Sequence, residues 1–359
     1  MRRLRVLALL AALALPSPAA ALAPPPPPRP APRALPERDD LHSTLLQDGF
    51  VRIRGLLPPE EALAWGARVA AASAAQTASC PYASTAGAPG CAGFRGDSFT
   101  RGRALEAADA ALLQLSHSPH LARAAAQVLN VSRVRLYQAT SFIKPPGAAP
   151  SAWHQDAAAC PLHTDKLATL WLALAPVPPE AGPLVFAAGS HLPGVPLPSL
   201  RDLAPRQRLG AMAKWTTAQV RNLTGLRVSK PLALAPGDAT LHLGWTLHAA
   251  PRNAHATAQR IALAITYFAD GARVHPELLE MEEAGAGGGG DGSEGKGVAF
   301  VGEDGRQLRV NLLQDDAETW GPWLHKKPSM LVPGAPVRDP VLTPLLYDEL
   351  YDSTPHIPL

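Results

Sequence analysis

The segment 151–156, Ser-Ala-Trp-His-Gln-Asp, places an imidazole and a carboxylate two positions apart, at His154 and Asp156. In an extended strand, side chains at i and i+2 point to the same side, so both groups could bind one ion. His248, far downstream in Gly-Trp-Thr-Leu-His, would supply a second imidazole. Two imidazoles and one carboxylate on one face of an ion are typical of non-heme Fe(II) oxygenases, because the opposite face stays open for a co-substrate and O2. These residue types therefore predict an iron centre.

A histidine two residues before an aspartate is a common pattern, and most instances are ordinary polar loops. The chain contains a second instance, at His163 and Asp165. The residues that follow the first pair distinguish it. Trp171 lies in a buried apolar run, His248 comes next, and Arg260 stands at the head of another apolar run. We therefore place the ion at the first pair.

This ordered series resembles the phytanoyl-CoA dioxygenase family of Fe(II)- and 2-oxoglutarate-dependent oxygenases. The resemblance extends over most of the chain, from about residue 40 to about residue 350. Each motif is weak alone, and the signal lies in their combination. In chain order they are 48–51 (Asp-Gly-Phe-Val), 136–138 (Leu-Tyr-Gln), 144–147 (Lys-Pro-Pro-Gly), 154–156, 189–191 (Gly-Ser-His), 236–240 (Pro-Gly-Asp-Ala-Thr), His248, Asn253 and Arg260.

The resemblance implies a double-stranded β-helix, a jelly-roll barrel whose mouth holds the iron. It makes His154, Asp156 and His248 the Fe(II) ligands, with 2-oxoglutarate and O2 in the open positions. Arg260 would pair with the far carboxylate of 2-oxoglutarate, since a guanidinium matches a carboxylate with two parallel hydrogen bonds. The residues expected to line the co-substrate pocket are Lys144, Gln138, Thr169 and Trp171.

Several of these assignments have alternatives. Arg260 could form a surface ion pair, Lys144 could be a solvated lysine beside a proline turn, and Trp171 could be core packing. His242 competes with His248 for the third ligand position, but Asn253 and Arg260 follow His248 at the spacing of the family. His191 is expected to order a loop rather than to bind metal.

The resemblance also bears on the type of reaction. Relatives that halogenate carry a small residue at the carboxylate position, so Asp156 favours hydroxylation of a small-molecule substrate. Two other classes remain open. One is a secreted binding module on the same barrel without turnover. The other is a metal-dependent hydrolase using the same ligands, for which no general base stands out.

The elements that must position these residues indicate an α+β fold. Helical patterns come first and short apolar runs follow, which predicts helices packed against a closed or double β-sheet. We expect helices at 41–46, 57–75, 104–115 and 119–129. We expect strands at 50–54, 134–143, 168–175, 184–186, 230–234, 239–243 and 261–268, and irregular structure after residue 297.

Residues 1–23 have the layout of a signal peptide, with Arg2, Arg3 and Arg5 before an apolar run and Ala-Leu-Ala at the end. This predicts the secretory pathway, either the endoplasmic reticulum lumen or the exterior, with organelle targeting as the alternative. A proline-rich linker (24–37), one dioxygenase domain (38–350) and a tail (351–359) would follow. Within the domain, the glycine-rich segment 283–297 is expected to be a disordered insertion.

Net charge, hydropathy and cysteine content bear on which partners and which compartment the chain can have. The formal net charge of +3 falls to zero without the three arginines of the leader, so nucleic-acid binding has little support. No later segment is long and apolar enough to cross a bilayer. Cys80 and Cys91 could form a small disulfide in an oxidising lumen.

Overall fold

The computed structural model describes residues 38–78, 100–103, 109–160, 162–193, 217–218, 220, 225–274, 282–283, 297–301, 307–311, 336–337 and 345–348. All of these belong to one compact unit, residues 33–359. The predicted signal peptide, the whole predicted linker (24–37), the Cys80–Cys91 pair and the predicted tail lie outside the described residues. So do residues 284–296 of the predicted insertion.

Four α-helices lie entirely within the described residues: α1 (Arg38–Asp48), α2 (Pro59–Ala78), α3 (Leu112–Ser116) and α4 (Pro119–Leu129). Glu60 and Glu61 in the first turn of α2 interact favourably with the positive end of the helix. Asn130, with a φ of 53°, ends α4 in the left-handed conformation. Three predicted helices are confirmed, while of 104–115 only 109–115 is described and α3 begins at residue 112. None of these helices combines the length and the apolar character needed to cross a membrane.

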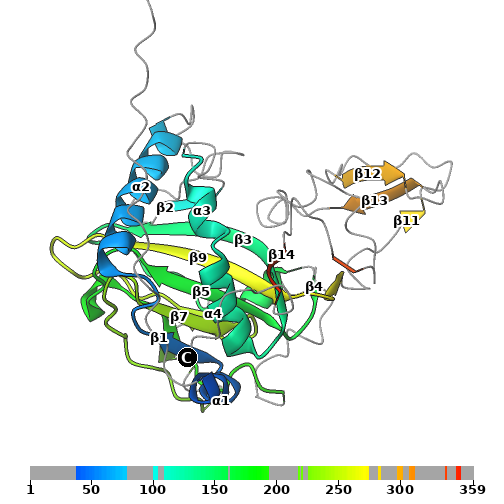
Figure 1. Cartoon of the computed structure of the whole chain (residues 1–359), viewed down its shortest axis with the longest axis horizontal. Coiled ribbons are helices and arrows are strands. Elements are labelled where there is room, and N and C mark those ends of the chain that lie inside the picture. Colours follow the sequence, from blue (N-terminus) through cyan, green and yellow to red (C-terminus); the bar gives the residue numbers. More distant parts are fainter. Residues whose placement is uncertain are drawn as a thin grey trace, which may run out of the picture. The chain divides into compact units, whose positions relative to one another are not determined.

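Seven strands form the main antiparallel sheet of the described chain (Figure 1). Their order is β1 (Phe50–Ile53), β7 (Ala239–Leu243), β5 (Leu167–Ala173), β9 (Arg260–Ala269), β3 (Arg133–Lys144) and β14 (Leu345–Asp348), and β2 (Thr100–Arg103) also pairs with β3. Neighbours in the sheet are far apart in sequence, as in a jelly roll. The predicted strands at 50–54, 134–143, 168–175, 239–243 and 261–268 are confirmed.

A shorter second layer is built around β6 (Val185–Phe186) and β8 (His248–Ala249), which pair with each other. His154 bridges to β8 on one side, and Ala187 bridges to Val228 on the other. The predicted strand at 230–234 is wrong. Of its residues only Leu234 makes a bridge, while 230, 231 and 233 are exposed and Pro231 has no N–H to donate to a ladder.

Further strands form small sheets of their own. β4 (Leu162–His163) pairs with β10 (Arg273–Val274), and β13 (Gln307–Asn311) pairs with both β11 (Glu282–Glu283) and β12 (Gly297–Val301). The expectation of irregular structure after residue 297 is therefore wrong for β12, β13 and β14. The composition of this region did not indicate that β12 and β13 pair with each other.

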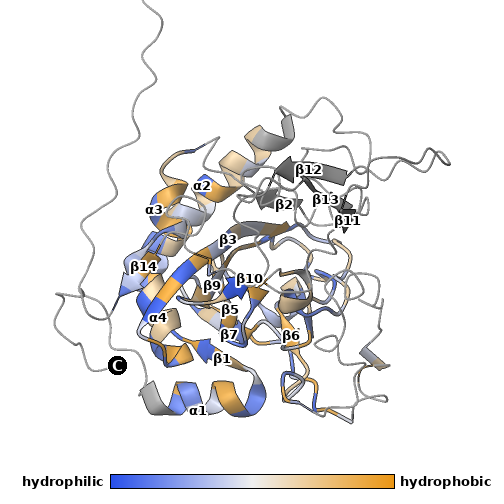
Figure 2. Cartoon of the chain, turned by 90° about the vertical axis from the view of Figure 1, so that its right-hand side faces the viewer, coloured by the Kyte–Doolittle hydropathy of each residue, from blue (hydrophilic) through white to orange (hydrophobic). Residues whose placement is uncertain are grey.

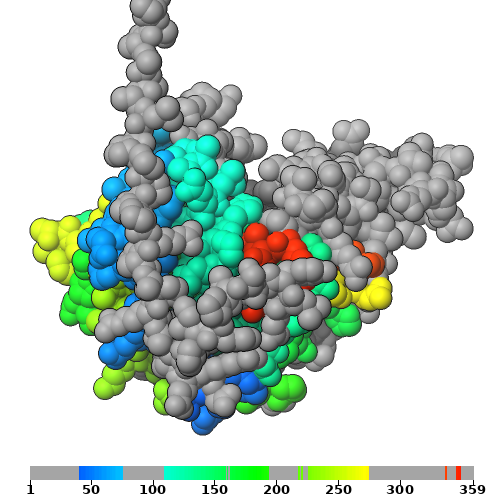
Figure 3. Space-filling view, viewed as in Figure 1, coloured from blue at the N-terminus to red at the C-terminus, as the bar shows by residue number. Residues whose placement is uncertain are grey.

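The main sheet is covered on both faces, which confirms the α+β class. On one face, apolar side chains of α1, α2 and α4 pack against β5, β7 and β9, and α2 and α4 show mixed hydropathy in Figure 2. The space-filling view shows α2 and the α3–α4 segment side by side over this face (Figure 3). On the other face, Phe50, Trp171 and Ala264 of the main sheet pack against Phe186 and Ala250 of the second layer. The hydrogen bonds among the described strands do not close a barrel.

The Pro-Gly-Asp motif at 236–238 sets the start of β7. Gly237 has a φ of +87°, and a Cβ there would lie 2.0 Å from the Leu57 carbonyl oxygen, so only glycine fits. The Asp238 carboxylate accepts hydrogen bonds from Arg52 at 2.6 Å and from the Gly55 N–H at 2.9 Å. Burial would raise the pKa of Asp238, but these hydrogen bonds hold it below its usual value. The motif thereby ties β7, which carries His242, to the chain around β1.

Candidate metal centre

His154 and His248 lie opposite each other in an antiparallel backbone pair. The His154 N–H donates to the His248 carbonyl at 2.9 Å, and the His248 N–H donates to the His154 carbonyl at 3.0 Å. Residues paired in this way have Cα atoms about 5.5 Å apart and side chains on the same face. The two ring centroids are accordingly 4.2 Å apart. Backbone pairing alone therefore brings two imidazoles together from remote segments.

Asp156 joins them because the chain remains extended as far as Gln155. Gln155 has φ −121° and ψ 123°, and a 3₁₀ helix begins at Asp156. The buried Gln155 side chain points the other way and donates to the Trp245 carbonyl at 2.6 Å. The carboxylate thus falls on the same side as the His154 ring, as the spacing of two residues predicts for an extended chain.

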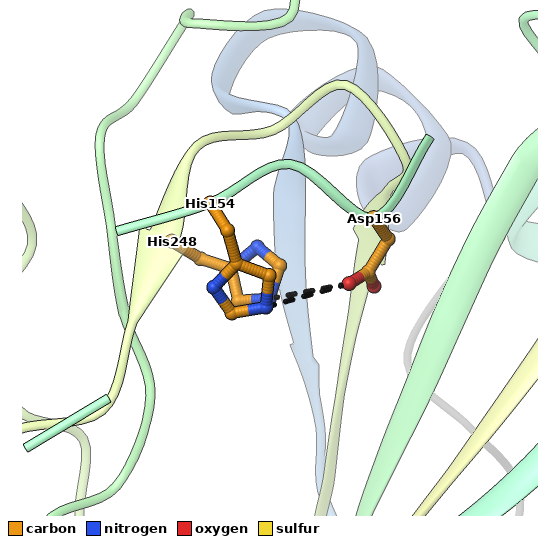
Figure 4. A group of neighbouring side chains, drawn as sticks. All are labelled: His154, Asp156 and His248. Atoms are coloured by element: carbon orange, nitrogen blue, oxygen red, sulfur yellow. Dashed lines mark ion pairs between the residues drawn. The ribbon is translucent and has the colours of Figure 1, made fainter. Parts of the chain in front are cut away.

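The three side chains converge on one point (Figure 4). The Asp156 Oδ1 atom is 3.6 Å from Nε2 of His154 and 3.7 Å from Nε2 of His248. One ligand atom from each residue lies within 4.8 Å of the others. Metal–nitrogen bonds are about 2.0–2.1 Å long, so two donors on one ion lie up to about 4 Å apart. The separations to Oδ1 therefore allow Asp156 to share an ion with each histidine.

Both imidazoles present the correct nitrogen. Nδ1 of His154 lies 2.9 Å from the Ala152 carbonyl oxygen, and Nδ1 of His248 lies 2.9 Å from the Thr246 carbonyl oxygen. A carbonyl can only accept, so each Nδ1 carries a proton, and in the neutral ring each Nε2 keeps its lone pair. Hydrogen bonds of this kind fix the tautomer and ring orientation of metal-binding histidines. The donor chemistry fits a divalent first-row metal.

Charge states at neutral pH fit as well. Burial, together with the neighbouring His242, lowers the pKa of His248 to about 4, despite the nearby carboxylate. Burial would raise the pKa of Asp156, but interactions with His248, His242 and His154 outweigh it and hold that pKa well below its usual value. The buried imidazole of His248 is therefore neutral and the carboxylate ionised, which are the forms that bind a metal.

The second oxygen of Asp156 makes contacts that sequence reasoning missed. Thr169 donates its hydroxyl to Asp156 Oδ2 at 2.7 Å, and Nε2 of His242 lies 3.2 Å from the same oxygen. Thr169 was expected to line the co-substrate pocket, and His242 was the lower-ranked candidate for the third ligand. They are register partners on β5 and β7. The period-2 alternation of β7 was the available signal, since it puts His242 on the inner face with Thr240.

A second cluster gathers two buried cations. Arg260 and Lys144 are register partners at the ends of β9 and β3, with exposed fractions of 2% and 0%. Arg260 donates to the Gly182 carbonyl at 2.6 Å, and its guanidinium lies 5.3 Å from the centre of the Trp171 ring. No carboxylate of the described residues pairs with Arg260, and its Nε lacks a hydrogen-bond partner there. This excludes the surface ion pair considered above.

Lys144 is equally enclosed, so it is no solvated lysine. Its Nζ donates to the carbonyls of Pro251 at 2.5 Å and Ala250 at 3.3 Å. Burial lowers the pKa of Lys144 to about 7, and the charge of Arg260 adds to the effect. Burial lowers the pKa of Arg260 to about 9. An anion bound here would relieve the repulsion between the two cations.

The remaining residues singled out from the sequence lie as follows. Gln138 is half-buried and pairs in register with Thr266 on β9. Trp171 is buried in the inner core and also contacts Arg260, so it packs the core and borders the cation cluster. Nε2 of His191 lies 3.0 Å from the Leu46 carbonyl, a loop-ordering contact. The second motif, at 163–165, has both its histidine and its aspartate exposed.

Comparisons with known proteins agree with an iron- and 2-oxoglutarate-dependent oxygenase. A family model described as phytanoyl-CoA dioxygenase (PhyH) matches residues 45–261, more than half of the chain. No curated protein matches the chain in sequence. The solved structure of the epimerase SnoN from nogalamycin biosynthesis, in complex with Fe3+, alpha ketoglutarate and nogalamycin RO, matches with a TM-score of 0.54 and 20% identity over 86% of this chain and 98% of that one.

The non-heme alpha ketoglutarate dependent carbocyclase SnoK, also from nogalamycin biosynthesis, is similar with a TM-score of 0.52 and 18% identity. That match covers 67% of this chain and 89% of SnoK. At such identities the two likenesses establish the fold, which agrees with the jelly-roll expectation. The family itself rests on the sequence model and its match over residues 45–261.

Proposed function

The chain belongs to the phytanoyl-CoA dioxygenase family of iron- and 2-oxoglutarate-dependent oxygenases, and on that premise we propose that it hydroxylates a small molecule. His154, Asp156 and His248 would hold Fe(II). The observation that carries this proposal is their convergence, with each histidine presenting Nε2 toward Asp156 Oδ1. Two neutral imidazoles and one carboxylate leave a bound Fe(II) with net positive charge and three open positions.

Arg260 and Lys144 would bind the far carboxylate of 2-oxoglutarate. Both are buried cations at neighbouring strand ends, and Arg260 has an unpartnered Nε beside a nitrogen that already donates to Gly182. A guanidinium with unpartnered N–H groups can bind a carboxylate by donating two parallel hydrogen bonds to it. The Trp171 ring against the guanidinium limits its rotation and so fixes the direction of approach.

The reaction proposed converts R–H, O2 and 2-oxoglutarate into R–OH, succinate and CO2. When bound, the iron supplies the site at which O2 is activated as 2-oxoglutarate loses CO2. The protein's part is to keep the three ligands in their binding forms, to orient the co-substrate through Arg260 and Lys144, and to exclude water from the inner core around Phe186.

The experiment that tests the proposal uses anaerobic protein with Fe(II) and 2-oxoglutarate. We expect a visible absorption band that needs both additions, and on admission of air the formation of succinate. Turnover over a panel of small metabolites would then identify R–H as the compound that couples succinate formation to its own oxidation. A protein that binds neither Fe(II) nor 2-oxoglutarate would instead be a binding module on the same fold.

Lys144 predicts a pH dependence for co-substrate binding. The anion favours the charged lysine, which predominates below its pKa of about 7 and is lost above it. Affinity for 2-oxoglutarate should therefore fall as pH rises from about 6 to about 8.5, by at most about tenfold per pH unit for one linked proton. Arg260 stays charged over this range, because its pKa is about 9.

The measurement is the concentration of 2-oxoglutarate that half-saturates the absorption band at each pH. Lys144→Met keeps a long side chain in the buried site and removes the charge. This variant should bind more weakly at low pH and lose the slope. A slope that persists in Lys144→Met would contradict the assignment of the titrating group to this lysine.

We further propose that the chain enters the secretory pathway. The support is the layout of residues 1–23, with a basic start, an apolar run and a small-residue end. Expression of the full chain in a secreting cell line tests this. Protein that begins at Pro24 in the medium or lumen would support the proposal, and uncleaved protein in an organelle would favour the alternative.

A further inference from the structure

We propose that Thr169 and His242 are positioning residues that hold Asp156 so that only one of its oxygens, Oδ1, faces the ion. The inference rests on the proposed function, since it concerns the same metal centre. Its basis is that the two oxygens of the Asp156 carboxylate have different neighbours. Oδ1 lies toward His154 and His248, whereas Oδ2 accepts contacts from the side chains behind it.

Thr169 contributes the shorter contact. Its hydroxyl donates to Asp156 Oδ2 at 2.7 Å and lies 3.0 Å from the hydroxyl of Thr266. Because the Thr169 proton is committed to the carboxylate, Thr266 must be the donor in that second contact. Both threonines are at most 5% exposed. A buried hydroxyl that donates to an ionised carboxylate makes one of the stronger kinds of hydrogen bond.

His242 can act only as a donor toward Asp156. Its Nε2 lies 3.2 Å from Oδ2, and its Nδ1 is buried with no hydrogen-bond partner among the described residues. A carboxylate oxygen accepts and cannot donate, so Nε2 must carry the proton. His154 and His248 each donate through Nδ1 to a carbonyl, which leaves an unprotonated Nε2 in the neutral ring for a metal. His242 instead directs a protonated Nε2 at Asp156, so it cannot bind a metal through that nitrogen in this state.

The consequence is a carboxylate restricted to one metal bond. An octahedral ion has six positions, of which the two histidines would occupy two. A carboxylate that binds through both oxygens would take two more and leave only two. Bidentate 2-oxoglutarate together with O2 needs three. Two hydrogen bonds to Oδ2 oppose the rotation that would bring this oxygen to the ion.

The supporting residues lie on paired strands of the main sheet. Thr169 and His242 face each other across β5 and β7, and Thr266 follows on β9, all within the main sheet. Asp156 itself lies at the start of a short 3₁₀ helix. A ligand carried by an irregular segment is thus held by side chains of two paired strands, one of which is in contact with Thr266 of a third, and sites built on strands are more precise than sites built on loops.

The test compares variants that remove or keep each donor. Thr169→Val removes the hydroxyl at constant shape, and Thr169→Ser keeps it. His242→Phe removes the N–H, and His242→Gln restores a donor. Thr240→Val is the matched control, because Thr240 is a buried threonine of β7 whose hydroxyl has no hydrogen-bond partner among the described residues.

Two readouts apply to each protein. The first is the dissociation constant for Co(II), with the visible spectrum of the bound ion before and after addition of 2-oxoglutarate. The second is the melting temperature of the metal-free protein. Residues that orient a metal ligand typically change metal affinity by about 10–100-fold. We expect Thr169→Val and His242→Phe each to weaken Co(II) binding by about tenfold and to reduce the spectral change caused by 2-oxoglutarate.

The conservative variants should recover most of this loss, and Thr240→Val should match the wild type. A purely structural role would instead lower the melting temperature while leaving Co(II) affinity and spectrum unchanged, and that result would overturn the inference. If the wild type binds no Co(II), both proposals fail. If it binds Co(II) but forms no succinate with Fe(II), the proposed function fails, and the variant comparison still decides this inference.

Discussion

Asp156→Ala is expected to abolish iron binding and, with it, the absorption band that depends on Fe(II) and 2-oxoglutarate. The substitution removes the only anionic ligand, leaving two neutral imidazoles on a divalent ion. It also leaves Thr169 and His242 without the oxygen they contact. Equilibrium dialysis with Fe(II) under anaerobic conditions measures the effect directly, and succinate formation should fall to background.

The chain offers a matched control for this substitution. Asp165 belongs to the second His-x-Asp motif, is exposed, and stands outside the converging set. Asp165→Ala should therefore bind Fe(II) as the wild type does. Should Asp165→Ala lose the metal while Asp156→Ala retains it, the assignment of the centre to residues 154, 156 and 248 would be wrong.

Arg260→Ala is expected to raise the 2-oxoglutarate concentration needed for half-saturation by about ten- to a hundredfold, with Fe(II) affinity unchanged. A hydrogen bond to a charged group is worth about 1.5–3 kcal/mol, and about 1.4 kcal/mol corresponds to tenfold in affinity. Lys144 remains in place and would retain part of the attraction. The half-saturating concentration from the absorption band is the appropriate measurement, because it separates co-substrate binding from later steps.

Arg252→Ala is the control. Arg252 lies shortly before Arg260 in the chain and is exposed, and like Arg260 it donates to a backbone carbonyl, that of Gly147 at 3.0 Å. It should leave the half-saturating concentration unchanged. Equal effects of the two substitutions would indicate a general charge effect and not a carboxylate site at Arg260. Loss of Fe(II) binding in Arg260→Ala would point to misfolding around β9.

Local spacing was enough to predict part of this centre. The alternation of an extended chain places His154 and Asp156 on one side, and the backbone remains extended as far as Gln155. Runs of apolar residues predicted the main strands, and only the segment 50–54 was predicted from alternation. The choice of His248 as the third residue required the family resemblance, because no local pattern connects it to the first two.

What the sequence could not reveal depends on pairing between distant strands. The contact of Thr169 with Asp156 follows from the register of β5 against β7, and a shift of one residue would turn that hydroxyl to the other face. The segment 230–234 is the reverse case, a strand that was predicted from the sequence and is not observed. Its composition suggested a strand, but a strand also needs a partner along its length, and only Leu234 has one.

The opposed backbone pair of His154 and His248 has a thermodynamic consequence. An ion held by both rings would act as a cross-link that closes the whole stretch of chain between them, including β5, β6 and β7. The unfolded chain cannot offer this arrangement, so metal occupancy is coupled to the folded state. Loss of iron would therefore remove this cross-link between residue 154 and β8 and lower the stability of the folded state.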